Sequence, residues 1–134
     1  MAIDYGRKRC GIAVTDTLRI VATALATVET SRLVGYVKDY VTANDVDRII
    51  VGLPTTMKGE PSESMRYITP ALGRLHKELP GMEIEMWDER FTSTLAHRAM
   101  IEGGFSRSTR RDKGAIDRMA AVIILNSYLD SHHQ

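Results

Sequence analysis

The sequence predicts one α/β domain, residues 1–134, with a mixed five-stranded sheet and helices on both faces. Three observations support this fold class. Three short strand-like stretches follow one another before Thr30, as in an antiparallel meander. The continuous apolar run from Arg48 to Pro54 is typical of a buried parallel strand. Amphipathic helical segments then alternate with strands, a pattern that places helices against both faces of a sheet.

The composition is that of an ordinary globular protein, with 43% hydrophobic and 26% charged residues. With 18 basic and 17 acidic residues, the net charge of +1 gives no strong global field, so a nucleic-acid partner would have to be held by local basic patches. No apolar run is long enough for a membrane span, and no signal-peptide region precedes Asp4. The single cysteine, Cys10, excludes an internal disulfide, fits a reducing cytoplasm and is expected to be a packed, inert thiol.

The first eleven residues organise the chain. A short apolar strand ends at Asp4, a glycine turn at Gly6 follows, and a second strand covers 9–15. A turn at Asp16 leads to a third strand over 20–28.

The rest of the chain alternates helices and strands. Thr30 or Ser31 is the expected N-cap of a helix that runs to about Ala43. Pro80-Gly81 ends a second helix, which opens at Ser62 or Ser64. The remaining segments are a strand over 83–88, a helix over 92–103, a basic loop over 104–114 and a last helix over 115–129, which makes the order βββαβαβαα.

Three acids are candidates for one site. Asp4 lies among apolar residues, where a lone carboxylate is costly unless it is paired or metal-bound; the alternative is a turn aspartate that accepts backbone N–H groups near Gly6. Glu89 follows a strand at the edge where α/β proteins bind ligands; the alternative is a surface pair with Arg90, and Asp88 remains a possible outer ligand or cap.

Asp117 lies in the first turn of the last helix. An acid there can simply favour the helix dipole, but Asp117 shares a helical stripe with Ala120, Ala121 and Ile124, which indicates that it points inward. Three converging carboxylates would repel one another unless they bound a hard cation, and oxygen ligands suit Mg²⁺ or Mn²⁺. The histidines show no zinc-ligand spacing: His76, His97, His132 and His133.

Basic residues surround these acids in the sequence. Four lie in the loop directly before Asp117 and could hold phosphates beside a metal, although a solvated charged segment is the alternative. Others follow Asp4 and Glu89 and could extend the same patch. The candidate substrate-binding set is Arg7, Lys8, Arg9, Arg90, Arg107, Arg110, Arg111 and Lys113.

Taken together, these motifs resemble the YqgF/RuvX family of RNase H-like proteins, over essentially the whole chain and in the right order. The residues that carry the resemblance are Asp4-Tyr5-Gly6, Lys8-Arg9, Gly11, Ala13-Val14, Asp16, Gly52-Leu53-Pro54, Gly59, Asp88-Glu89-Arg90, Thr92, Thr94, Lys113, Asp117, Ala120-Ala121, Leu125 and Tyr128-Leu129. The resemblance implies an RNase H-like fold and metal-binding acids at Asp4, Glu89 and Asp117. It also implies a bacterial cytoplasmic nuclease that matures the 5′ end of pre-16S ribosomal RNA, similar to Holliday-junction resolvases.

The chain departs from the family pattern at its start, because only three residues precede Asp4. We therefore expect a short first strand, and a higher melting temperature when three or four apolar-rich residues are added before Met1.

Four functions are compatible with these features. The leading one is a Mg²⁺- or Mn²⁺-dependent endonuclease acting on structured RNA, as a monomer or weak homodimer. A junction resolvase on branched DNA would use the same acids, and two symmetric cuts would favour a dimer. A non-catalytic nucleic-acid-binding factor for ribosome assembly would need only the basic residues. An actin-like or sugar-kinase ATPase is disfavoured, because such proteins need two domains of this kind.

Overall fold

The computed structural model describes residues 1–6, 8–16, 21–53, 65–88 and 113–132. Within these residues the predicted order of strands and helices is confirmed. The strands are β1 (Ala2–Asp4), β2 (Arg9–Thr15), β3 (Ala22–Glu29), β4 (Arg48–Leu53) and β5 (Glu83–Asp88). The helices are the 3₁₀ turn η1 (Thr30–Arg32), α1 (Leu33–Ala43), α2 (Met65–Glu78) and α5 (Lys113–His132).

The five strands form one mixed sheet in the order β3-β2-β1-β4-β5. The first three strands are antiparallel neighbours, whereas β4 runs parallel to both β1 and β5. The shortest strand, β1, is therefore the central one. Its last residue, Asp4, pairs with Gly11 of β2.

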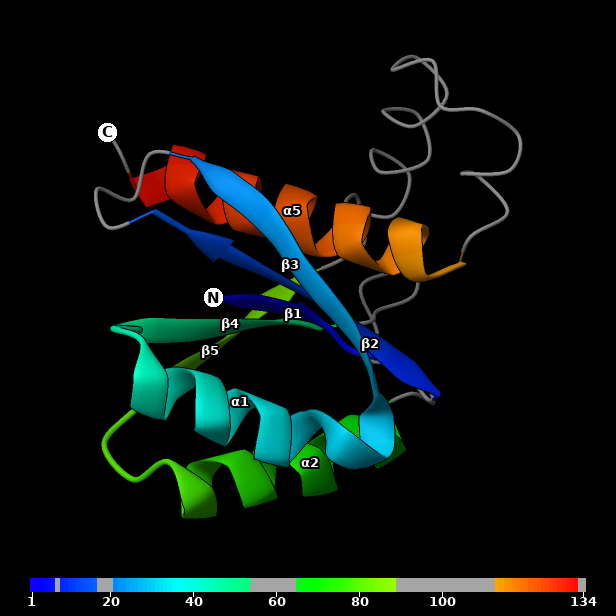
Figure 1. Ribbon diagram of the computed structural model, residues 1–134, viewed down its shortest axis with the longest axis vertical. Coiled ribbons are helices and arrows are strands. Elements are labelled where there is room, and N and C mark those ends of the chain that lie inside the picture. Colours follow the sequence, from blue (N-terminus) through cyan, green and yellow to red (C-terminus); the bar gives the residue numbers. More distant parts are fainter. Residues whose placement is uncertain (7, 17–20, 54–64, 89–112, 133–134) are drawn as a thin grey trace.

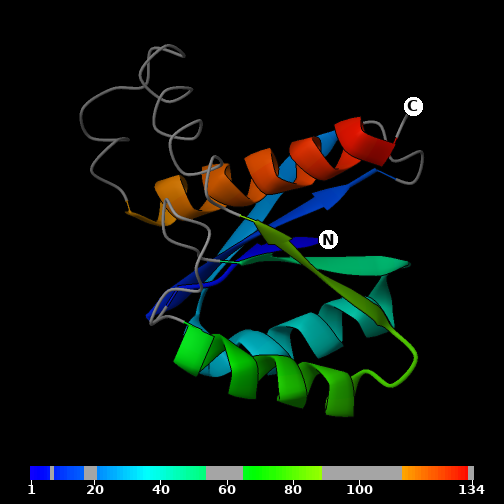
Figure 2. The same cartoon turned by 180° about the vertical axis from the view of Figure 1, so that it is seen from behind.

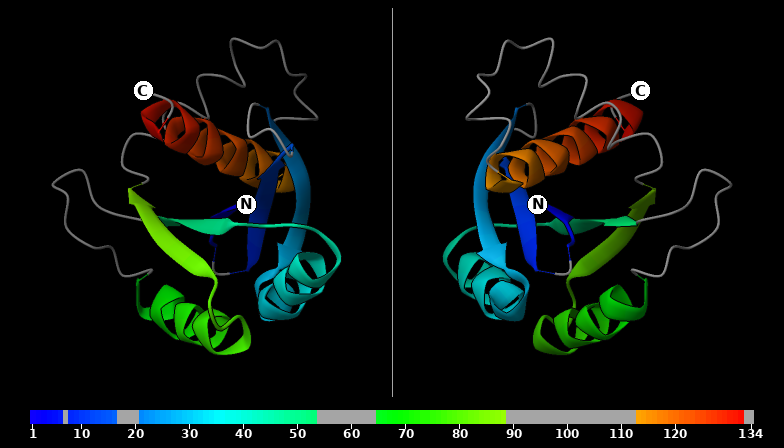
Figure 3. Two further views of the ribbon diagram at one scale, coloured as in Figure 1. Left: turned by 90° about the vertical axis from the view of Figure 1, so that its left-hand side faces the viewer. Right: turned by 90° about the vertical axis from the view of Figure 1, so that its right-hand side faces the viewer.

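Helices cover both faces of the sheet, as predicted. Helices α1 and α2 lie on one face and α5 lies alone on the other among the described elements (Figures 1 and 2). The side views of Figure 3 show the twisted sheet between these two layers.

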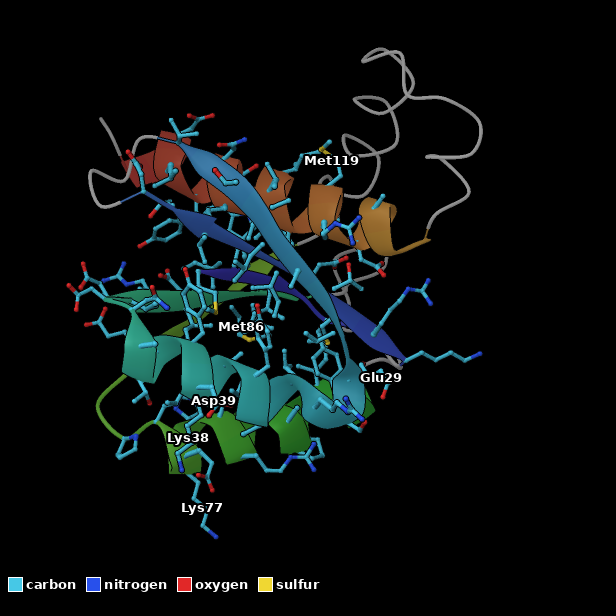
Figure 4. The ribbon with its side chains drawn as sticks, in the orientation of Figure 1. Glu29, Lys38, Asp39, Lys77, Met86 and Met119 are labelled. Carbon is cyan, nitrogen blue, oxygen red and sulfur yellow. The ribbon has the colours of Figure 1, made fainter. Side chains whose placement is uncertain are left out.

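Strand alternation sorts the core into two clusters. Ile3, Ile12 and Val51 belong to the cluster that packs toward α1 and α2. In Figure 4, Met86 lies between the sheet and these helices, whereas Lys77 projects outward. Strand residues of the opposite parity pack under α5 in the second cluster: Ala2, Ala13 and Ile50. The helix contributes Ala121, Ile124, Leu125 and Leu129 to the same cluster. Asp4 is two residues beyond Ala2 on β1 and therefore faces α5.

The predicted cap of α1 is wrong. The residue that precedes α1 is Arg32, and no side chain caps that helix. The Thr30 hydroxyl donates instead to the carbonyl oxygen of Gly6 at 2.7 Å, and the Thr30 amide donates to the carbonyl oxygen of Lys8 at 3.0 Å. Thr30 thus ties the start of the helical layer to the β1–β2 turn, close to Asp4.

Other boundaries shift by two or three residues. The last helix begins at Lys113 rather than Ala115 and continues past Leu129 to His132. The third strand is described from Ala22. The predicted helix over 92–103, most of the basic loop and the loop after Leu53 lie outside the described residues. Among the helices the structure describes, none has the length and apolar character needed to cross a bilayer.

Candidate active site

The site is built where the start of α5 crosses the β1–β2 pair. Gly11 lies opposite Asp4 in the antiparallel register. A β-carbon at position 11 would lie 2.0 Å from the carbonyl oxygen of Asp117 and 2.2 Å from its carbonyl carbon. Only glycine permits this contact between helix backbone and strand backbone. Gly11 therefore lets the first turn of α5 sit directly beside Asp4.

The two predicted acids Asp4 and Asp117 are thus brought together. Their proximity shows in the electrostatics, because the charge of Asp4 is one of the effects that raise the pKa of Asp117. Asp4 is half-buried and has no hydrogen-bond or ion-pair partner among the described residues. The alternative of a turn aspartate that accepts backbone N–H groups is therefore not what the described part of the chain shows.

Asp117 points inward, as its helical stripe predicted. Its pKa is raised above the usual aspartate range, chiefly because burial disfavours the charged carboxylate. A hydrogen bond and the positive charge of Arg9 act in the opposite direction, as does the charge of Arg118. The Arg9 Nε donates to Asp117 Oδ2 at 2.6 Å. A simple helix-dipole role does not account for this half-buried, paired carboxylate.

The edge strand β3 fixes the start of α5. The Thr27 hydroxyl donates to the carbonyl oxygen of Gly114 at 2.8 Å, and the Arg118 guanidinium donates to the same Thr27 hydroxyl at 2.9 Å. These bonds hold the first turn of α5 on the sheet and so hold Asp117 in place.

With this arrangement described, comparison with known proteins identifies the family. A family model described as "RuvX: Holliday junction resolvase" matches residues 1–131. The chain belongs to the RuvX family.

Relatives of this RuvX chain are similar over nearly their whole length. A protein of Bacteroides fragilis is 50% identical over 131 residues, which cover 98% of this chain and 95% of the relative. Proteins of Parabacteroides distasonis and Flavobacterium johnsoniae are 48% and 41% identical, with 98% of this chain and 94% and 95% of the relatives covered. All three bear the name "Putative pre-16S rRNA nuclease".

Several predicted site residues of this RuvX chain lie outside the described residues. They are the third acid, Glu89, and the basic residues Arg7, Arg90, Arg107, Arg110 and Arg111. Lys8 is exposed in the β1–β2 turn, and Lys113 is the first residue of α5. Within the described part of the chain, no three Asp, Glu, His or Cys side chains form a metal-ligand cluster. The described geometry therefore supplies two carboxylates, Asp4 and Asp117.

Cys10 of this RuvX chain is buried and lies between the Thr30 hydroxyl and the Gly6 carbonyl, at 3.5 Å and 3.9 Å from its Sγ. Burial is the main cause that raises the pKa of its thiol. Because Cys10 precedes Gly11 on β2, its side chain faces the α1 layer, away from Asp117. The prediction of a packed thiol is confirmed.

A cavity of about 800 Å³ lies at the other end of the sheet, near Met1, Arg48 and Tyr128. Neither Asp4 nor Asp117 lines it. Arg48 donates hydrogen bonds there to the Glu83 carboxylate and to the Tyr128 hydroxyl. Its guanidinium also lies over the Tyr128 ring, as in a cation–π contact. This cavity of the RuvX chain is separate from the acidic pair.

Sequence reasoning placed the two acids but missed two features around them. One is the contact at Gly11, which a glycine inside a strand pattern could have signalled. The other is the pairing of Arg9 with Asp117, two residues that are 108 positions apart. Local patterns carry no signal for such a pair.

Proposed function

We propose that this chain is a divalent-metal-dependent nuclease that hydrolyses phosphodiester bonds of structured nucleic acid. The observation that carries the proposal is the placement of Asp4 and Asp117 on one face of the sheet, through the helix–strand contact at Gly11. Two neighbouring carboxylates, one of them without a partner among the described residues, form an oxygen-rich site that suits a hard cation. Membership of the RuvX family supports a nuclease.

The residues fit a Mg²⁺ or Mn²⁺ site. Asp4 and Asp117 would hold the cation, and Glu89 is proposed as the third ligand. Trp87 of β5 packs in the cluster under α5, and Glu89 comes two positions later in the sequence. In the sequence Glu89 has the same parity as Trp87 and Asp88 does not, and this spacing favours Glu89 over Asp88. A bound cation would supply charge stabilisation at the phosphate and an activated water.

For the substrate we propose the 5′ end of pre-16S ribosomal RNA, and for the location the cytoplasm. The names of the relatives support this substrate. The chain's own residues would hold the RNA backbone: Arg7, Lys8, Arg9, Arg90, Arg107, Arg110, Arg111 and Lys113. Arginine suits this role because its guanidinium can make two parallel hydrogen bonds to one phosphate.

A junction resolvase acting on branched DNA is the second candidate. The description of the matching family favours it. Two symmetric cuts would need two copies of the site at a fixed spacing, so a stable dimer would support this function over RNA processing by a monomer or weak homodimer. A binding role without cleavage is the third candidate.

The test compares cleavage of end-labelled precursor 16S RNA and of a four-way DNA junction in Mn²⁺. Wild type is assayed beside Asp117→Asn and beside Asp130→Asn, an exposed aspartate near the end of the same helix. We expect Asp117→Asn to lose cleavage while Asp130→Asn keeps it. Equal cutting by all three proteins would remove Asp117 from the site, and cutting of the junction alone would select the resolvase function. No cutting of either substrate by wild type would leave the binding role.

A further inference from the structure

A short polar contact joins two of the site's own residues, Arg9 and Asp117. Arg9 Nε and Asp117 Oδ2 are 2.6 Å apart, and the two side chains are 35% and 21% exposed. Arg9 lies two residues before Gly11 on β2, so strand alternation puts its side chain on the face that α5 covers. The strand and the helix start therefore fix both ends of the pair.

The pair occupies one of the oxygens that a metal would need. Asp4 brings a second negative charge to the same place, and Arg9 is the cation in direct contact with Asp117 among the described residues. A second cation that acts on Asp117, Arg118, donates a hydrogen bond to the Thr27 hydroxyl. Arg9 thus stands where positive charge is required and where a divalent cation would also be attracted.

We propose that Arg9 is a positioning residue that serves as the resident counter-ion of Asp117 and competes with the divalent cation for it. Before the cation binds, Arg9 holds the Asp117 carboxylate in place and balances its charge. A guanidinium bonded to Oδ2 repels a cation approaching the same carboxylate, so Arg9 has to leave that oxygen when the cation binds. This inference rests on the proposed metal-dependent function.

The released guanidinium would then lie beside the metal site with all five N–H donors available. A phosphate of the substrate is the partner that matches such a fork. Cation binding and substrate binding would be linked in this way, because the first event frees the side chain that the second one uses.

The test is Mn²⁺ binding to the free protein, measured by titration calorimetry without substrate. Arg9→Gln removes the charge, keeps a polar side chain and is expected to tighten Mn²⁺ binding roughly tenfold, the effect of losing one charge-assisted hydrogen bond that opposes it. Arg9→Lys keeps the charge and is expected to bind Mn²⁺ about as wild type does. Arg118→Gln is the matched control, because it removes a nearby positive charge that donates a hydrogen bond to Thr27. Arg118→Gln is expected to change the Mn²⁺ affinity clearly less than Arg9→Gln does.

A second readout separates this role from a purely structural one. In RNA cleavage at saturating Mn²⁺, Arg9→Gln is expected to raise the KM for RNA even though its metal affinity is higher, and Arg9→Lys to restore part of the KM. A structural defect at Arg9 would weaken both kinds of binding together.

Three outcomes would overturn the inference. Weaker or unchanged Mn²⁺ binding by Arg9→Gln, with a circular-dichroism spectrum like that of wild type, would show that Arg9 does not compete with the cation. An equal gain in Arg118→Gln would reduce the effect to overall charge. Failure of the wild type itself to bind Mn²⁺ would instead refute the proposed metal dependence, which distinguishes the two failures.

Discussion

Replacing Gly11 by alanine tests whether the helix–strand contact builds the site. The new β-carbon would lie 2.0 Å from the Asp117 carbonyl oxygen, whereas an ordinary contact needs about 3.4 Å. The start of α5 would therefore have to withdraw by more than about 1 Å, carrying Asp117 away from Asp4 and from Arg9. We expect a loss of about 1–3 kcal/mol in the free energy of unfolding, the usual cost of overpacking.

The effect on activity should exceed the effect on stability. A displacement of about 1 Å in a catalytic group can lower the rate roughly 100-fold. Urea unfolding followed by circular dichroism gives the free energy, and cleavage of precursor RNA in Mn²⁺ gives the rate for protein that is still folded.

Gly35→Ala provides the matched control. Gly35 lies in α1, and a β-carbon there would meet nothing within 4 Å. Alanine is favoured over glycine in a helix by about 1 kcal/mol, so this variant should be slightly more stable and fully active. If Gly11→Ala unfolds and cleaves as wild type does, the close approach of Asp117 to β2 does not organise the site.

Three further predictions concern the same framework. Thr27→Val removes the hydroxyl that bonds both Gly114 and Arg118, and should cost about 1–3 kcal/mol in urea unfolding; no loss would show that these bonds do not anchor α5. Burial lowers the pKa of the Met1 amino group to about 6, so the folded protein binds fewer protons there than the unfolded chain between about pH 6 and 8. The free energy of unfolding should therefore rise with pH over that window. Adding three or four apolar-rich residues before Met1 should flatten this rise and increase the melting temperature at pH 7 by an amount equivalent to about 1 kcal/mol. An unchanged pH profile of the extended protein would contradict this. The pKa of Asp117 is raised, so its contribution to stability is greatest below the ordinary aspartate pKa and falls as the pH rises through its raised value; Asp117→Asn should remove that part of the acid-range pH dependence of the unfolding free energy.

The strands, and the face of the sheet on which each residue lies, could be predicted from the sequence because they depend on local patterns of apolar and polar residues. The apolar run of β4 fixes which of its residues are buried, and the alternation of β5 places Met86 and Trp87 in different clusters. The Ala120-Ala121 stripe fixes the inner face of α5. Asp4 and Asp117 could be assigned to one site by the same reasoning, since each lies at the end of an element that faces the core.

The depth of packing could not be predicted in this way. How closely α5 approaches β2 depends on a contact between backbones at Gly11 and Asp117, and periodicity does not encode it. The cap of α1 was wrongly predicted because the Thr30 hydroxyl donates its hydrogen bond to the carbonyl oxygen of Gly6 instead of capping the helix. Gly6 is distant from Thr30 in sequence but adjacent to it in the fold. Glu89 stays a prediction, because it lies outside the described residues.

The position of α5 also has a consequence for the order in which the protein matures during synthesis. The face of β1 that carries Asp4 is covered by the last helix of the described chain, and Asp117 is made more than 100 residues after Asp4. At a translation rate of roughly 5–20 residues per second, that face stays uncovered for about 5–20 s. A nascent chain therefore cannot assemble the acidic pair while it is still short. Any cleavage that needs both acids can begin only after α5 has been made and has packed against β2.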